Sequence, residues 1–184
     1  MKNTVFAISF FIFTCSVTSY SFSQANNTVS IPSLPLLANK VVYNASVVLD
    51  TGFNKEKLFD NAQQWYKANF ESADNTLFIY KPDSGKLSGT GIIHAKKHEN
   101  RIDPEDIFFT IDIAVQKGKW DYKIYEIYGF EKAGKFYYSD MYNEAIYPPA
   151  KSKWNAEYKI TMINNMDEKI KAMLGTLNLF MAKK

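Results

Sequence analysis

The two histidines of the chain, His94 and His98, lie four residues apart, a spacing that on a helix would place both on one metal-binding face. His94 instead ends a run of strand character. Four residues of a strand span about 13 Å, so the two rings cannot reach one ion unless the backbone turns. The acidic run at 103–106 lacks the spacing and the glycine of a calcium loop. We therefore predict two surface histidines, a solvated turn, and no bound metal or cofactor.

Other catalytic patterns fail on their context. The glycines of Gly89-Thr90-Gly91 lie inside a strand-like run with no following helix to bind a phosphate. No serine lies in a nucleophile-elbow pattern. Only two histidines, both near one strand end, could act as the base of a catalytic triad. An acid pair of Asp112 and Glu126 is conceivable, but the predicted register puts the two on opposite faces of the sheet. No catalytic residue is predicted.

A candidate binding surface lies on the predicted outer face of two central strands. We expect its members to share that face: Thr110, Asp112, Lys123, Tyr125 and Ile127. Together they could form a recognition surface for a ligand or a protein partner. The alternative is that these are scattered surface aromatics of the kind normal in soluble proteins, which need no function.

Hydrophobic periodicity predicts the elements that position these residues. Residues 41–50 alternate as a half-buried strand, and Asn54 can cap a helix over 55–70. Strands follow at 76–81 and 86–96, joined by the turn residues Pro82 to Gly85. A strand at 107–117, a returning strand from Trp120, an edge strand at 135–142 and a long amphipathic C-terminal helix complete the order.

The hairpin after the strand at 107–117 fixes an expected register. A two-residue turn at Gly118-Lys119 pairs Lys117 with Trp120 and keeps apolar residues opposite apolar ones. Glu126 then falls on the inner face beside Ile111. Either a bulge turns its side chain outward, or its carboxylate has a buried partner.

The N-terminus has the pattern of a cleaved signal peptide over 1–23. Lys2 precedes an apolar run, and the small residues Ser21 and Ser23 fit cleavage between Ser23 and Gln24. Polar residues interrupt the run, which disfavours a permanent anchor, so no transmembrane span is expected after cleavage. Lipidation at Cys15 fits poorly. We expect a flexible leader at 24–39, a single domain at 40–184, and export to the periplasm or cell envelope of a Gram-negative bacterium.

Charge and cysteine content exclude further classes. The chain of 184 residues carries a formal net charge of +3, and Arg101 is its single arginine. Nucleic-acid readers concentrate charge and use arginine for bidentate contacts, so no nucleic-acid partner is expected. Cys15 is the single cysteine. It would leave with the signal peptide, so the core must supply the stability.

The order of strand, helix, four to five strands and helix resembles a family of exported Bacteroidetes domains of unknown function with a TATA-binding-protein-like (TBP-like) fold. The resemblance covers about residues 41–181. It rests on Val47 to Leu49, Leu58 and Trp65, the Leu87, Gly89, Gly91 run, Lys117 to Trp120, and the terminal helix with Trp154 and Ile170. It implies an α+β, TBP-like fold: a curved antiparallel sheet with two helices packed on one face. It implies no functional residue.

These expectations favour a non-catalytic exported domain that binds an unknown ligand or envelope protein through its open sheet face. The alternative is an uncharacterised hydrolase or metal-dependent enzyme with a site near His94 and Glu126. Nucleic-acid binding by analogy with the namesake of the fold is disfavoured, because a fold does not carry a function with it.

Overall fold

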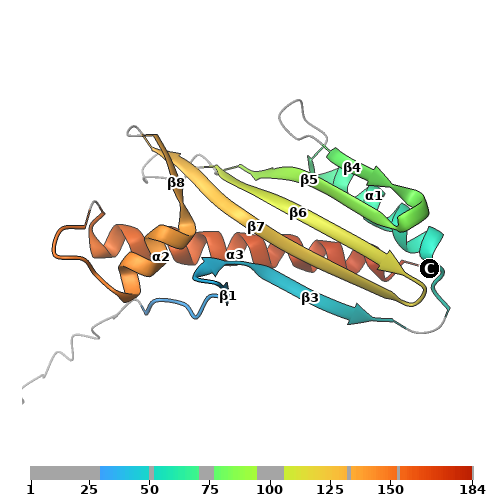
Figure 1. The fold of residues 1–184 in the computed structure, drawn as a ribbon, viewed down its shortest axis with the longest axis horizontal. Coiled ribbons are helices and arrows are strands. Elements are labelled where there is room, and N and C mark those ends of the chain that lie inside the picture. The colour runs from blue at the N-terminus through green and yellow to red at the C-terminus, as the bar shows by residue number, and fades with distance from the viewer. Residues whose placement is uncertain are drawn as a thin grey trace, which may run out of the picture.

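A curved antiparallel sheet forms the centre of the molecule, as a computed structural model of the chain shows (Figure 1). The structure describes residues 30–49, 52–70, 77–94, 106–131, 134–152 and 154–183. The expected signal peptide with Cys15, its cleavage between Ser23 and Gln24, and His98 lie outside these residues. The predicted order of elements is confirmed, with one helix added.

The sheet has the strand order β3-β7-β6-β5-β4, and β8 also pairs with β7. A separate two-stranded ribbon, β1-β2, precedes it. The strands are β1 Leu36–Leu37, β2 Lys40–Val41, β3 Tyr43–Val48, β4 Leu77–Lys81, β5 Lys86–Ile93, β6 Ile107–Gln116, β7 Lys119–Glu131 and β8 Gly134–Tyr137.

The helices are α1 Lys55–Phe70, α2 Tyr138–Ile146 and α3 Ala156–Met181, with a short 3₁₀ turn η1 Pro82–Ser84. Helices α1 and α3 cover one face of the sheet, and α2 lies at its end beside β8, where it contacts α3 (Figure 1). The expectation of two helices on one face is confirmed, and α2 is an addition. The other face carries no helix among the described residues.

Local signals place the two long helices where the sequence predicts them. The side chain of Asn54 accepts a 2.7 Å hydrogen bond from the Lys57 amide at the start of α1, as expected of an N-cap. Asn155 caps α3 in the same way through the Tyr158 amide at 2.7 Å. The helical stripes are buried, including Leu58, Trp65, Ile163, Ile170 and Leu177. Burial of these stripes against the sheet holds both helices in place.

The predicted edge strand at 135–142 is wrong in its second half. Strand β8 ends at Tyr137, and α2 begins at the next residue. Tyr138, Met141 and Tyr142 are all buried, at the spacing i, i+3, i+4 of a helix face. A helix buries all three on one side, whereas a strand would send Tyr138 and Met141 to opposite faces.

The predicted register of β6 and β7 is wrong by two residues. Gln116 pairs with Lys119, so the turn consists of Lys117 and Gly118 rather than Gly118 and Lys119. Gly118 has φ +66°, a conformation that glycine adopts without a steric cost. Because a shift of two keeps every side chain on its face, the predicted inner face of β6 is still correct, and Phe109, Ile111, Ile113 and Val115 are buried there.

Residues 30–39 of the leader expected at 24–39 are described. They include β1, and the side chain of Leu34 is 6% exposed within the core. The Leu34 amide donates a 3.1 Å hydrogen bond to the Tyr142 hydroxyl of α2. This segment therefore belongs to the folded unit. No helix in the described part of the chain is both long and apolar enough to cross a membrane.

Candidate functional site

Strand β7 lacks a partner over three residues on one side. β3 pairs with β7 up to Ile124, and β8 pairs with it from Tyr128 onward. Among the described strands, none pairs with residues 125–127 on that side. β2 lies close to β7 at this interruption, so the exposed residues around it are the first candidate for a site.

A β-bulge lies in the same gap. The register between β6 and β7 shifts between the partners of Phe108 and Thr110, and Glu126 has φ +53°. The bulge turns the Glu126 side chain out to solvent, which is the first of the two alternatives drawn from the sequence. It also moves Ile127 to the inner face, where it is 1% exposed within the core. The expectation that Ile127 belongs to the outer surface is therefore wrong.

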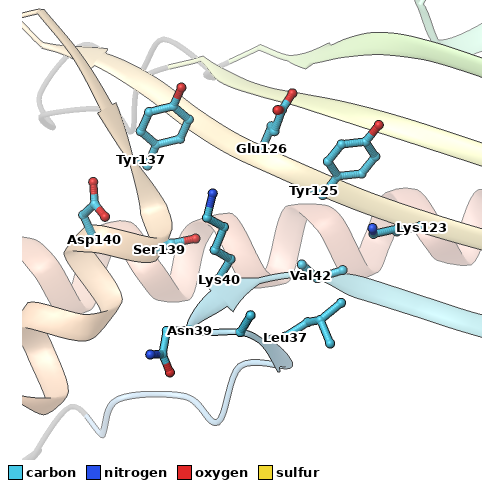
Figure 2. Close-up of a pocket in the computed structure, with 11 residues that line it drawn as sticks. Leu37, Asn39, Lys40, Val42, Lys123, Tyr125, Glu126, Tyr137, Ser139 and Asp140 are labelled. Atoms are coloured by element: carbon cyan, nitrogen blue, oxygen red, sulfur yellow. The ribbon is translucent and has the colours of Figure 1, made fainter.

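A hollow of about 460 Å³ opens over this gap (Figure 2). Three elements supply its walls: the β1-β2 ribbon, the middle of β7, and the junction of β8 with α2. The lining residues are Leu37, Ala38, Asn39, Lys40, Val42, Lys123, Tyr125, Glu126, Tyr137, Ser139 and Asp140. The volume lies in the range of small-molecule sites, which run from about 300 to 1,000 Å³. We call it the β7 hollow.

The β1-β2 ribbon is held against the rest of the molecule by defined contacts. Ala38 and Asn39 have φ +50° and +60°, the two consecutive positive values of a tight hairpin turn. The Val41 amide donates a 2.9 Å hydrogen bond to the Ser139 hydroxyl, and Asn143 donates one of 3.1 Å to the Asn39 carbonyl. These bonds to α2 fix the wall that carries Lys40. Figure 2 shows the Lys40 side chain pointing toward Tyr137 and Glu126.

Tyr125 is the centre of the opposite wall. The Lys123 ammonium lies 4.8 Å from the centroid of its ring, within the range of a cation–π contact. The Tyr125 hydroxyl is hydrogen-bonded to Asp112. Burial first, and then the charges of Asp112 and Glu126, raise the pKa of the Tyr125 hydroxyl above its ordinary value of 10.0. Because the hydroxyl donates its proton to Asp112, its oxygen is left as a hydrogen-bond acceptor toward a ligand.

Asp112 and Glu126 were expected on opposite faces, and the structure corrects this. Both charges act on the Tyr125 hydroxyl, and Glu126 Oε2 accepts a 3.1 Å hydrogen bond from Thr110 Oγ1 on the outer face. The bulge is the cause, since it returns Glu126 to the face of its strand neighbour Tyr125. Of the five predicted site residues, Lys123 and Tyr125 line the β7 hollow, and Thr110 and Asp112 lie directly across from them on β6.

The chemistry of the β7 hollow is that of recognition. Its four charged residues are two lysines and two carboxylates, so their charges balance: Lys40, Lys123, Glu126 and Asp140. Tyrosine and serine hydroxyls add neutral donors and acceptors, while Leu37 and Val42 add apolar surface. Such a lining suits a polar ligand without a large net charge.

His94 and Glu126, which the enzyme hypothesis joined, line different hollows. His94 Nδ1 lies 3.2 Å from Asp106 Oδ2, and the two residues line a second hollow of about 400 Å³ with Phe108 and Tyr128. The side chains of His94 and Asp106 are both exposed to solvent. Across the described residues, no group of three or more His, Cys, Asp or Glu side chains is placed to hold a metal ion. The loop residues 101–105 lie outside that description.

A row of aromatic rings separates the two hollows. The rings of Phe108 and Tyr128 are stacked with centroids 5.1 Å apart. The ammonium group of Lys135, on the neighbouring strand β8, lies 3.6 Å from the Tyr128 centroid. Tyr137 meets Tyr128 at 5.9 Å. Tyr128 is already contacted by a stacked ring and a cation. These aromatic rings therefore stabilise the sheet and do not form an open platform for stacking a ligand.

Sequence reasoning missed eight of the eleven lining residues of the β7 hollow: Leu37, Ala38, Asn39, Lys40, Val42, Tyr137, Ser139 and Asp140. Two signals were present in the sequence. Asparagine at position 39, after the apolar run Leu36 to Ala38, is typical of a tight hairpin turn. The helical spacing of Tyr138, Met141 and Tyr142 indicates α2, whose first turn supplies Ser139 and Asp140.

Comparison with known proteins places this fold in context. No curated protein matches the chain. The structure resembles that of a DUF4468 family protein from Bacteroides ovatus, with a TM-score of 0.60 and 15% identity over 82% of this chain and 91% of the other. It also resembles a TBP-like protein from Parabacteroides distasonis, with a TM-score of 0.59 and 12% identity over 78% of this chain and 96% of the other.

The sequence gives an independent match to the same family. Residues 45–129 match the model of a family described as a domain of unknown function (DUF4468) with TBP-like fold. This segment includes Lys123, Tyr125 and Glu126, whereas the β1-β2 and α2 walls of the hollow lie outside it. The resemblance expected from the sequence is confirmed for the family model and the fold: residues 45–129 resemble a DUF4468 domain, and the structure has a TBP-like fold.

Proposed function

We propose that this protein is a non-catalytic binding domain that takes a small polar ligand, without a large net charge, into the β7 hollow. The observation that carries the proposal is the interruption of the sheet at residues 125–127 with Glu126 in a left-handed conformation. A non-glycine residue there costs about 1 to 2 kcal/mol. Backbone strain of this kind is concentrated at functional sites, and here it aims a carboxylate into a hollow.

The lining supports binding better than catalysis. Lys40 and Glu126 come from opposite walls, and Tyr137 and Tyr125 lie to either side of Glu126 in Figure 2. A ligand that carries hydroxyl groups, or both an amine and a carboxylate, would find a partner for each group. Saccharides, amino acids and short peptides meet this requirement, whereas a polyanion such as a nucleic acid does not.

The experiment is native mass spectrometry on the full protein recovered from its own cells, followed by calorimetric titration with the compound found. Lys40→Met should weaken binding by about tenfold or more, because a hydrogen bond to a charged group contributes about 1.5 to 3 kcal/mol. Lys86→Met removes another exposed lysine, from β5 outside the hollow, and should leave the affinity unchanged.

Two results would count against the proposal. The first is protein that carries no bound mass and whose melting temperature does not shift with panels of neutral saccharides, amino acids and dipeptides. The second is a bound compound whose affinity falls equally in Lys40→Met and Lys86→Met, since a site elsewhere would then account for it.

We further propose that the protein acts outside the cytoplasm, in the periplasm or cell envelope, where it meets a soluble ligand or an envelope protein. The support is the N-terminal pattern of Lys2, the apolar run after it, and Ser21 and Ser23. The mass of the mature protein tests this directly. A chain that begins at Gln24 supports export, whereas a full-length chain in the soluble cell extract opposes it.

A further inference from the structure

The four charged side chains of the β7 hollow take part in no ion pair within the described chain. Lys40 and Lys123 are cationic, and Glu126 and Asp140 are anionic. No oppositely charged atom of the described residues lies within 4.0 Å of any of the four. A ligand that removes such a charge from water without pairing it leaves the lost hydration uncompensated. The lining therefore favours a ligand that carries charges of its own.

Lys40 and Glu126 are the charged residues that face each other across the hollow. Lys40 belongs to β2, and Glu126 belongs to the bulge of β7. Figure 2 shows Lys40 pointing toward Glu126, whereas Asp140 and Lys123 lie at opposite ends of the labelled group. The Lys123 ammonium is already placed 4.8 Å from the centroid of the Tyr125 ring. A ligand in the middle of the hollow therefore meets a cation on one wall and an anion on the other.

The wall that carries Lys40 presents hydrogen-bond donors. Ser139 Oγ accepts a 2.9 Å hydrogen bond from the amide of Val41, the residue that follows Lys40 in the ribbon. Within the described chain, no group accepts the proton of the Ser139 hydroxyl, so this proton is available to a ligand. The Lys40 ammonium adds further N–H donors. A carboxylate, which only accepts hydrogen bonds, matches this wall.

The β7 wall presents hydrogen-bond acceptors. Glu126 Oε2 accepts a 3.1 Å hydrogen bond from Thr110 Oγ1, while Glu126 is exposed and keeps its other carboxylate oxygen for a ligand. The Tyr125 hydroxyl donates to Asp112, so its oxygen is also an acceptor. An ammonium group, which only donates hydrogen bonds and carries the opposite charge to Glu126, matches this wall.

We propose that the β7 hollow binds a small zwitterion, either an amino acid or a short peptide. The carboxylate of the ligand binds Lys40 and Ser139. The ammonium group binds Glu126 and the Tyr125 oxygen. This inference rests on the proposed function and selects one class among the ligands that it admits. A neutral saccharide would displace water from Lys40 and Glu126 without supplying a counter-charge to either.

Calorimetric titration of the full protein with three matched compounds tests the proposal. The first is the amino acid or dipeptide that raises the melting temperature most in a panel of the common amino acids and their alanyl dipeptides. The other two are its N-acetyl derivative and its C-terminal amide. We expect each blocked form to bind about tenfold or more weakly than the parent, because each lacks one hydrogen-bonded charge pair.

Two variants assign the ends of the ligand. Lys40→Met should remove the preference for the free carboxylate over the amide and keep the preference for the free amine. Glu126→Gln should do the reverse, and its side chain can still accept the hydrogen bond from Thr110. Glu168→Gln, at an exposed position of α3, is the matched control and should keep both preferences.

The outcomes separate this inference from the proposed function. Equal affinity for the parent compound and both blocked forms overturns the zwitterion and leaves the hollow as a binding site. So does a saccharide whose affinity depends on Lys40, in a protein that binds no amino acid or dipeptide. If Lys40→Met and Glu126→Gln each keep both preferences, the assigned ends are wrong. Protein that binds no saccharide, amino acid or dipeptide overturns the inference and the proposed function together.

Discussion

Glu126 of β7 accepts a 3.1 Å hydrogen bond from the hydroxyl of Thr110 on β6 while its own backbone has φ +53°. Thr110 is 7% exposed, so the bond ties the bulged residue to a well-covered part of the neighbouring strand. The conformation of Glu126 is thus held by the sheet around it. This relationship explains how a strained residue persists in the middle of a strand of 13 residues.

The stability of variants at Glu126 should follow how well each substituted residue tolerates a positive φ. Glu126→Val is expected to lower the free energy of unfolding by about 1 to 2 kcal/mol more than Glu126→Gly, because a β-branched side chain is strained in the left-handed region and glycine is not. Urea denaturation measures both. The same pair at exposed Lys123, in regular strand geometry, should show the reverse order, since glycine weakens a strand. Equal effects at 126 would contradict a strained backbone.

Two glycines of β5 are covered by rings from different elements. A Cβ at Gly89 would collide with the Tyr66 ring of α1, and one at Gly91 would collide with the Phe109 ring of β6. The Tyr66 hydroxyl is also bonded to the Thr90 carbonyl at 2.6 Å, so its ring has little freedom to move. We expect Gly89→Ala and Gly91→Ala each to cost about 1 to 3 kcal/mol in thermal or chemical unfolding.

Gly175 supplies the opposite case for the same substitution. It lies exposed in α3, and a Cβ there would meet no atom within 4 Å. Gly175→Ala should therefore stabilise the protein by up to about 1 kcal/mol through helix propensity. If all three alanine variants moved stability in the same direction, the contact argument at β5 would be wrong.

The long elements were predictable because one strong period governs each of them. Helix α1 has the bounds expected from its stripe of Leu58, Phe59, Ala62, Trp65 and Tyr66, and α3 follows its own stripe in the same way. The inner face of β6 was correct for the same reason. Burial against one shared core makes these patterns regular, and the pattern alone then suffices.

The site was harder to predict because its geometry arises where the period breaks. The extra residue at Glu126 moves every later side chain of β7 to the opposite face. A prediction without this bulge therefore put Ile127 on the outer face and placed Asp112 and Glu126 on opposite faces. The two-residue error in the turn after Gln116 did not affect the predicted faces, because a shift of two residues leaves each side chain on the same face of the sheet. The β1-β2 ribbon is held by hydrogen bonds from the Leu34 and Val41 amides to Tyr142 and Ser139 of α2, and local sequence does not reveal such long-range contacts.

Tyr43 and Asp167 form a buried link between β3 and α3. The Tyr43 hydroxyl donates a 2.8 Å hydrogen bond to Asp167 Oδ1, and both residues are 5% exposed. Tyr43→Phe should cost about 1.5 to 3 kcal/mol, the value of a hydrogen bond to a charged group. Asp167→Ala should cost about 2 to 3 kcal/mol, because it leaves a buried hydroxyl without this acceptor. Tyr80→Phe, at a tyrosine 48% exposed, should change stability by less than about 0.5 kcal/mol.

Alkaline pH should destabilise the protein through its buried tyrosines. Burial raises the pKa of Tyr66 from 10.0 to about 12. The unfolded chain therefore loses this proton near pH 10 while the folded protein keeps it, and the free energy of unfolding falls as pH rises between these two values. The slope per tyrosine is about 1.4 kcal/mol per pH unit. Below pH 10 the contribution is constant.

Tyr66→Phe isolates this effect. The variant lacks the Thr90 hydrogen bond at every pH, which lowers its free energy of unfolding by a constant amount. Between about pH 9 and pH 11.5 its free energy of unfolding should fall by about 2 kcal/mol less than that of the wild type. Tyr43, whose pKa burial and Asp167 also raise, continues to contribute in both proteins. Tyr147→Phe, at a residue 79% exposed, should reproduce the wild-type pH dependence. Identical alkaline slopes for Tyr66→Phe and the wild type would show that Tyr66 titrates normally in the folded protein.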